Sequence, residues 1–209
     1  MSIPDPRLFL IALLMLWGGG GSAIANESKN YAGFQYSIVD AESSRAGIPL
    51  SFEPSALVGR MGSFINNYLA LEARVGFGFS DDKATMSRLD ATEENEIIDQ
   101  YGLDVENLFG FYLLGNLPVA NAIDLYGLIG ITSLDVGTTT GQTIVNIATS
   151  DELAAFTKTG SRTENGLSYG LGGRIGITEK SSLNLEYMSY IDKSDFTFNA
   201  INVGFLFNF

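Results

Sequence analysis

Hydrophobic and polar residues alternate along several segments of this chain, most clearly over residues 68–79. There, an apolar side chain stands at every second position, and the positions between hold Glu72, Arg74 and small residues. Because successive side chains of a β-strand point to opposite faces, this segment predicts a strand with one apolar face and one charged or small face. Residues 167–177 and 183–191 repeat the pattern, so we expect strands there too.

Five weaker segments extend the same pattern, which brings the predicted number of strands to eight. They are residues 31–39, 54–62, 100–115, 121–132 and 196–209. Amphipathic helices are the competing interpretation, but the frequent glycines and the content of Tyr, Phe, Val and Ile disfavour helices and suit strands. Each segment is near the roughly 9–11 residues that a tilted membrane-spanning strand requires. The chain is therefore predicted to be all-β.

The connections between these strands alternate between long and short. Long connections cover 40–53, 80–99 and 133–166, and short ones cover 63–67, 116–120, 178–182 and, breaking the alternation, 192–195. Transmembrane barrels have short periplasmic turns and longer extracellular loops, which gives this rhythm when the strand number is even. We therefore expect an eight-stranded antiparallel up-and-down transmembrane β-barrel with both termini in the periplasm. The residues expected to form short turns are Asn66-Asn67, Asn116-Leu117-Pro118 and Glu179-Lys180-Ser181.

The polar faces of the predicted strands favour a membrane barrel over a soluble one. A soluble barrel buries its apolar face and shows polar residues to water. Here the polar face combines glycines with charges of both signs, which fit a narrow interior better than an exterior. The charged residues predicted to face the lumen are Arg60, Glu72, Arg74, Asp124, Arg174 and Glu186. We interpret them as a structural network of ion pairs, because unpaired charges in the interior would be strongly destabilising.

Two other functions fit the same strand pattern. The lumen charges would also suit a narrow conduit for ions or small apolar molecules, although side chains can fill the interior of an eight-stranded barrel. A secreted, soluble, lipocalin-like carrier would have the same rhythm of strands, but with an apolar pocket inside.

The N-terminal segment has the features of a secretory signal peptide. Residues 8–17 form an apolar run of ten residues, which is too short to cross a bilayer as a helix. Small residues follow, and Ala23-Ile24-Ala25 forms an A-x-A cleavage site. We therefore expect residues 1–25 to be removed on export and residues 26–209 to form one barrel domain.

Composition argues against several classes of function. The chain of 209 residues contains no Cys and no His, so it lacks the thiolate and imidazole groups of most hydrolases and zinc sites. Its 24 acidic residues against 12 basic ones argue against a nucleic-acid partner. We expect no enzyme activity, no metal and no cofactor. Glu72 and Glu186 would be the candidates for a mechanism with paired carboxylates.

Three other segments invite a functional interpretation. The acidic connection Ser80–Asp99 lacks the regular spacing of a calcium loop, so we expect a solvated outer loop. Residues Gly170–Gly176 (GLGGRIG) do not match the dinucleotide fingerprint and suit a packed lumen. In the longest connection, Ser150–Phe156 suggests a short helix over the barrel mouth, whereas Gln142–Thr149 could extend the adjoining strands. This long connection is the expected place for a partner to bind.

The last strand, Asn199–Phe209, resembles the C-terminal strand of the OmpA-like and OmpX-like family of outer-membrane β-barrels. Residues 110–131, with an N-x-P turn followed by L-Y-G-x-x-G, are similar to the central hairpin of that family, and residues 166–191 to its sixth and seventh strands. The resemblance implies an integral protein of a Gram-negative outer membrane, with a structural or surface-interaction role carried by extracellular loops and an unknown surface ligand. It also implies that Phe207 and Phe209 form a signal for the barrel-assembly machinery.

Overall fold

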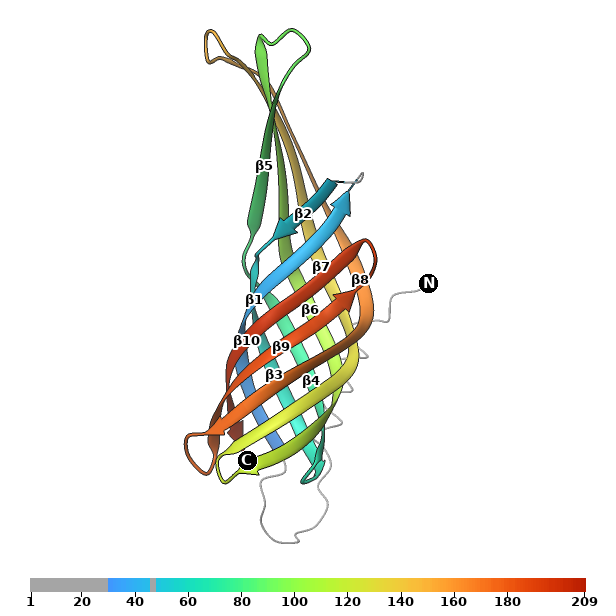
Figure 1. Ribbon diagram of the computed structural model, residues 1–209, viewed down its shortest axis with the longest axis vertical. Coiled ribbons are helices and arrows are strands. Elements are labelled where there is room, and N and C mark those ends of the chain that lie inside the picture. Colours follow the sequence, from blue (N-terminus) through green and yellow to red (C-terminus); the bar gives the residue numbers. More distant parts are fainter. Residues whose placement is uncertain (1–29, 46–47) are drawn as a thin grey trace.

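The computed structural model describes residues 30–45 and 48–209. The expected signal peptide, residues 1–25, lies outside this part of the chain. Among the described residues there is no helical segment that could span a bilayer. The strands are β1 (Asn30–Arg45), β2 (Ile48–Phe52), β3 (Ser55–Asn66), β4 (Leu69–Ser80), β5 (Asp82–Leu89), β6 (Asn95–Ala120), β7 (Ile123–Asn146), β8 (Glu152–Gly176), β9 (Ser181–Asp192) and β10 (Phe196–Asn208). Figure 1 shows a barrel from which a narrower sheet projects at one end.

A closed ring of eight antiparallel strands confirms the predicted architecture. Around the ring the order is β1, β3, β4, β6, β7, β8, β9 and β10. The first and last strands close the ring by pairing, from Tyr31 opposite Asn208 to Ser43 opposite Phe196 (Figure 1). β2 pairs with the end of β1, and β5 pairs with the distal part of β6, so both lie outside the ring. All eight predicted strands are found in the ring.

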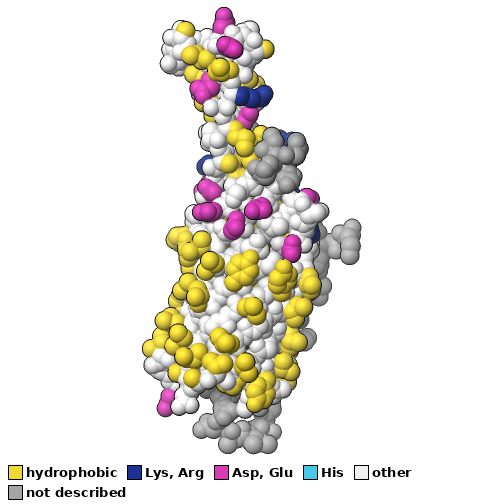
Figure 2. Space-filling model, viewed as in Figure 1, with side chains coloured by type: hydrophobic (Ala, Val, Ile, Leu, Met, Phe, Trp, Pro, Cys, Tyr) yellow, Lys and Arg dark blue, Asp and Glu magenta, His cyan; other side chains and the backbone are white. Residues whose placement is uncertain are grey.

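Side chains of the ring strands face outward and inward as the alternation predicts. Along β4, Leu71, Val75 and Phe77 are exposed, whereas Glu72 and Arg74 are 2% and 1% exposed. Figure 2 shows outward hydrophobic side chains over the visible face of the barrel body, with acidic side chains gathered above them. An apolar surface of this extent is unfavourable in water and favourable against hydrocarbon. The charged inward face does not fit the soluble carrier with an apolar pocket.

The end of β9 departs from the predicted facing. The alternation over 183–191 places Ile191 outward, but this side chain is fully buried. In the pairing with β10, Ile191 stands opposite Phe198 and Ser189 opposite Asn199, so Tyr190 is an extra residue. Such a bulge shifts the alternation of the residues that follow it. Ile191 therefore joins Tyr190 in the interior.

Three strands run beyond their predicted ends, β7 and β8 much further than β6. β6, β7 and β8 contain 26, 24 and 25 residues, against 12 in β3, β4 and β9. Their distal parts and β5 form a four-stranded sheet in the order β5, β6, β7, β8, which we call the projecting sheet (Figure 1).

The long connections are accordingly more ordered than the sequence pattern suggests. The predicted helix over Ser150–Phe156 is wrong, because β8 begins at Glu152; the alternative, an extension of the strands, is correct as far as Asn146. The acidic connection Ser80–Asp99 contains β5 and the start of β6 instead of an open loop.

Short turns at residues 67–68, 121–122 and 177–180 close the opposite end of the barrel, which we call the short-turn end. The predicted turn at Asn116-Leu117-Pro118 is misplaced, because β6 continues to Ala120. The pairing with β7 shifts register between Pro118 and Ala120, and such an irregularity accommodates a proline in a strand. The described chain also begins and ends here, where the Phe209 N–H donates to the Asn30 carbonyl at 2.9 Å.

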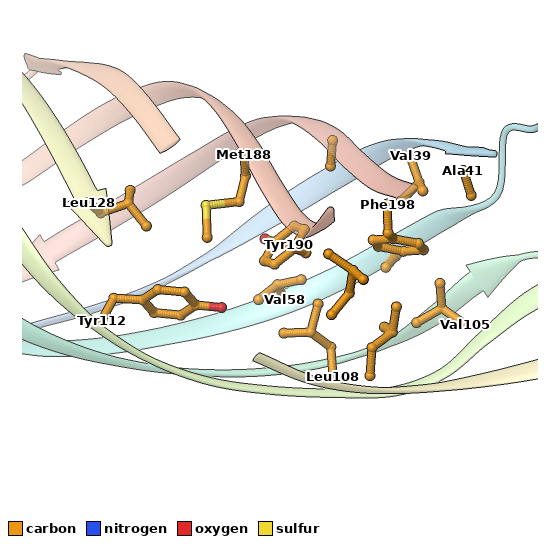
Figure 3. Packing of buried hydrophobic residues seen from close by; sticks show 14 of the residues in the cluster. Val39, Ala41, Val58, Val105, Leu108, Tyr112, Leu128, Met188, Tyr190 and Phe198 are labelled. Atoms are coloured by element: carbon orange, nitrogen blue, oxygen red, sulfur yellow. The ribbon is translucent and has the colours of Figure 1, made fainter. Parts of the chain in front are cut away.

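Hydrophobic side chains fill the interior on the side of the projecting sheet. The rings of Tyr190 and Phe198 lie 6.1 Å apart, and those of Phe196 and Phe198 lie 6.3 Å apart. Leu108 is also buried, and Figure 3 shows it in the interior together with Tyr190 and Phe198. The Arg162 guanidinium covers the Phe196 ring at 4.5 Å. This core closes the barrel toward the projecting sheet.

Candidate functional site

Two arginines and two glutamates meet in the barrel interior. Arg60 lies on β3, Glu72 and Arg74 on β4, and Glu186 on β9, and all four side chains are inaccessible to solvent. Arg60 donates from Nε and Nη2 to the two oxygens of Glu72, at 3.1 and 2.9 Å. Arg74 donates from Nη1 and Nη2 to the two oxygens of Glu186, at 2.6 and 2.8 Å, and from Nε to Glu72 at 2.6 Å. These four residues, the lumen network, have no net charge.

Neutral side chains complete the hydrogen bonding of both glutamates. Glu72 accepts from the Tyr31 hydroxyl at 2.6 Å. Glu186 accepts from the Tyr126 hydroxyl at 3.1 Å and from the Asn202 amide at 2.9 Å. Together with the arginines, each carboxylate accepts four hydrogen bonds. Buried charges are tolerated only when their polar atoms are paired in this way, so the network forms a saturated plug.

Glycines leave the space that these large side chains occupy. A Cβ atom at Gly62 would overlap the Tyr31 ring, and one at Gly172 would overlap the Tyr126 ring. Both rings belong to tyrosines that donate to the lumen network. The glycines that alternate with apolar residues therefore have a steric role. For Gly172, which lies in the GLGGRIG segment, the structure supports packing in the lumen.

Asp124 and Arg174 lie apart from the lumen network, near the short-turn end. They face each other across β7 and β8, and Arg174 Nη1 is 3.9 Å from Asp124 Oδ2, which is beyond hydrogen-bonding distance. The Arg174 guanidinium lies 5.6, 5.7 and 5.5 Å from the ring centres of Tyr31, Phe64 and Tyr126. The structure thus brings together four of the six predicted lumen charges and places the other two as a separate, looser pair.

Sequence reasoning missed the neutral residues that link the network to its surroundings. Gln35 accepts from Arg60 Nη1 at 3.1 Å and donates to the Tyr190 hydroxyl at 3.3 Å. Asn202 donates to Glu186. The available signal was weak: Gln35 and Asn202 are uncharged polar residues, and they lie in two of the five weaker predicted strands.

The projecting sheet presents exposed apolar side chains and unpaired strand edges. Near its tip, Leu153 and Phe156 are 57% and 66% exposed. β8 pairs with β9 only from Tyr169 to Gly176, so residues 152–168 have no strand partner on that side within the described part of the chain. An unpaired edge offers backbone N–H and C=O groups to another strand.

Carboxylates set the electrostatics of the projecting sheet. Partial burial, together with the negative charges of Glu106 and Asp81, raises the pKa of Asp104. In the turn before β6, the side chain of Asn95 and that of Thr92 donate to Asp90 and lower the pKa of its carboxyl. Among the described residues, no group of three or more acidic side chains is arranged to hold a metal ion.

The two C-terminal aromatic residues lie on the outer surface at the short-turn end. Phe207 stands between Ala32 of β1 and Ser181 of β9 and is 46% exposed. Phe209 follows the last residue of β10 and is 49% exposed. Both side chains are therefore accessible from outside the barrel.

Comparison with known proteins identifies the class of barrel. The model of the outer membrane protein beta-barrel domain family matches residues 9–209. The solved structure of Ail, the attachment invasion locus protein of Yersinia pestis, covers 88% of this chain and 100% of its own, with a TM-score of 0.51 and 11% identity. Neisserial surface protein A covers 86% of this chain and 97% of its own, with a TM-score of 0.50 and 12% identity. No curated protein gives a significant match. At these identities, the two structures show a shared fold.

Proposed function

The chain belongs to the outer membrane protein β-barrel domain family and lies in the outer membrane, and we propose that it is a sealed scaffold that holds the projecting sheet at the cell surface for interaction with other molecules. The observation that carries this proposal is the projecting sheet itself. Its strands extend well past the ring, and its tip exposes Leu153 and Phe156. Met86, Leu89 and Ile147 of the same sheet and its turn are exposed as well, and apolar side chains that gather in one region are typical of interaction surfaces.

The filled interior supports a scaffold more than a conduit. Saturated ion pairs occupy one part of the lumen, and the rings of Tyr190, Phe196 and Phe198 occupy the part nearer the projecting sheet. The same saturation argues against catalysis by Glu72 and Glu186, because each carboxylate already accepts four hydrogen bonds. We therefore place the function on the surface and not in the lumen.

The proposal includes an orientation: the short-turn end faces the periplasm, and the projecting sheet faces outward. Short turns on the periplasmic side are the rule in such barrels. In this proposal, the expected signal peptide, residues 1–25, directs export of the chain. The barrel-assembly machinery then inserts the protein in this orientation by recognising Phe207 and Phe209. Both phenylalanines are accessible on the outer surface, as such recognition requires.

The orientation can be tested with single cysteines, because the chain has none of its own. Thr159→Cys, on the exposed edge of β8, should react with a membrane-impermeant maleimide on intact cells. Lys180→Cys, in a short turn, should react only after the outer membrane is permeabilised. Both positions are exposed, so their intrinsic accessibility is matched. Labelling of Lys180→Cys alone on intact cells would reverse the proposed orientation.

The interaction role can be tested by replacing Leu153 and Phe156 with serine. Cells displaying this double variant should bind to surfaces coated with a panel of extracellular proteins at least tenfold less than cells displaying the unchanged protein. The control variant Thr157→Ser, on the same exposed strand, should bind normally. Equal binding by the double variant, at equal surface display, would contradict a contact through the tip.

A further inference from the structure

Arg174 is a buried cation whose donors are largely unused. The residue is 6% exposed, and its Nε and Nη2 atoms have no hydrogen-bond partner. The remaining nitrogen, Nη1, faces Asp124 at 3.9 Å. A buried donor without a hydrogen-bond partner costs free energy. Such a donor is therefore expected to have a functional role or to bind a ligand.

The two unused atoms are those that bind a carboxylate side-on. Nε and Nη2 lie along one edge of the planar guanidinium and together form a fork that matches two oxygens of a carboxylate or phosphate. Arg60 uses the same two atoms for the two oxygens of Glu72, at 3.1 and 2.9 Å. One lumen arginine thus has its fork filled by a glutamate of the chain, whereas the two equivalent atoms of Arg174 are buried and have no hydrogen-bond partner.

The surroundings hold Arg174 in place without a hydrogen bond to the fork. The rings of Tyr31, Phe64 and Tyr126 lie 5.5–5.7 Å from the guanidinium carbon and stabilise its charge through their faces. Tyr31 and Tyr126 are fixed in turn by their hydrogen bonds to Glu72 and Glu186. The ring atoms cannot donate hydrogen bonds to an anion. They surround the guanidinium, and the hydrogen bonds to an anion would come from Arg174.

A second polar group lies on the same inner face. Ser182 stands opposite Gly176, two residues along β8 from Arg174, so its side chain is a diagonal neighbour of the arginine. Its hydroxyl is buried and has no hydrogen-bond partner. A hydroxyl at this position can donate to a further oxygen of a bound anion.

The charge balance near Arg174 permits an anion. The lumen network carries two positive and two negative charges and is neutral as a unit. Asp124 is the negative group nearest to Arg174, but it faces Nη1 rather than the fork, and its side chain is 30% exposed. Solvent therefore screens its repulsion of an anion held by Nε and Nη2.

We propose that Arg174, with Ser182, forms an anion-binding site at the short-turn end of the lumen, which takes a carboxylate or a phosphate group through the side-on fork. The group can come from a small soluble anion or from the headgroup of an anionic phospholipid. Both sources present the same two oxygens to the arginine.

The site can be tested on the whole protein in a maltoside detergent, which contains neither phosphate nor carboxylate. The Nε–H signals of the arginines are followed by ¹H–¹⁵N NMR while inorganic phosphate or acetate is added. The Arg174 signal should shift in a saturable way. The Arg60 and Arg74 signals are internal controls and should stay in place, because both Nε atoms already donate to Glu72.

Arg174→Lys keeps the charge but removes the fork, and it should weaken phosphate binding at least tenfold, measured at the backbone amide of Ser182. Correlation of the Nε–H signal with the backbone assigns Arg174 in the unchanged protein, so the test does not depend on the folding of the variant. A third titration uses short-chain phosphatidylglycerol: a shift with this lipid alone identifies a headgroup, and a shift with the soluble anions identifies a soluble ligand. No saturable shift of Arg174 with any of the three probes, or equal shifts at all three arginines, would overturn the proposal.

Discussion

Removal of Arg74 is the sharpest test of the lumen network. Arg74 donates to Glu72 at 2.6 Å and to both oxygens of Glu186, at 2.6 and 2.8 Å. In Arg74→Met the two buried glutamates would share one cation, Arg60, whose Nη2 lies 3.8 Å from Glu186. Breaking a buried ion pair by removing one partner costs about 3–5 kcal/mol, because the other charge stays buried without compensation.

A second variant separates the loss of charge pairing from the loss of packing. In Arg74→Met with Glu186→Gln, no unpaired charge remains, since Arg60 and Glu72 still pair through two hydrogen bonds. We expect the double variant to be more stable than Arg74→Met, with a coupling of about 0.5–3 kcal/mol between the two positions. Lys180→Met, at an exposed short turn, should change stability by less than about 0.5 kcal/mol.

Equilibrium urea unfolding in lipid vesicles, followed by far-ultraviolet circular dichroism, measures these differences. Tryptophan fluorescence is unsuitable, because the single tryptophan, Trp17, lies in the expected signal peptide. The reasoning is refuted if Arg74→Met loses less than about 1 kcal/mol, or if the double variant loses the sum of the two single losses.

The remaining predictions concern the outer surface, the lumen and the projecting sheet. Val75→Arg, near the middle of an outward-facing strand, should cost about 2–4 kcal/mol in the same unfolding assay, whereas Phe79→Arg, near the strand end, should cost about 0–1 kcal/mol; equal costs would contradict the assigned depth. Purified protein should give no defined conductance in planar bilayers, and a channel altered by Glu72→Ala would support the conduit instead. The raised pKa of Asp104 means that its ionised form disfavours the folded state, a penalty present above the folded pKa and lost as the pH falls below the unfolded value. Asp104→Asn should therefore slow proteolysis of the projecting sheet at pH 7 but not near pH 3; the opposite order would exclude this account.

The alternation of residue types is sufficient to predict the ring and its facing. Along β4 the outward position of Val75 and the inward position of Glu72 follow from period two alone. The alternation fails where a bulge adds a residue, as at Tyr190, because it describes a strand and not its pairing. The projecting parts of β6, β7 and β8 were missed for a related reason. Water lies on both faces of the projecting sheet, so the two faces do not need different residue types, and the alternation that predicts a strand is weak there.

The choice of ion-pair partners could not be predicted from the sequence. Arg74 and Glu186 are separated by 112 positions, and they meet because β4 and β9 face each other across the lumen. This geometry depends on the tilt and stagger of all the strands. The looseness of the other pair could not be predicted either. The sequence gives no sign that Asp124, the carboxylate neighbour of Arg174, lies too far away for a hydrogen bond.

The seam between β1 and β10 joins Tyr31 to Asn208, almost the full length of the described chain. The ring therefore cannot close until both β1 and β10 have been synthesised, because each strand supplies one side of the seam. Before the seam forms, β1 lacks β10 along one edge, and the backbone N–H and C=O groups of that edge have no strand partner there. Unpaired backbone groups are costly in hydrocarbon, so the pairing of the first ring strand with the last is what makes this cylinder compatible with the interior of a membrane.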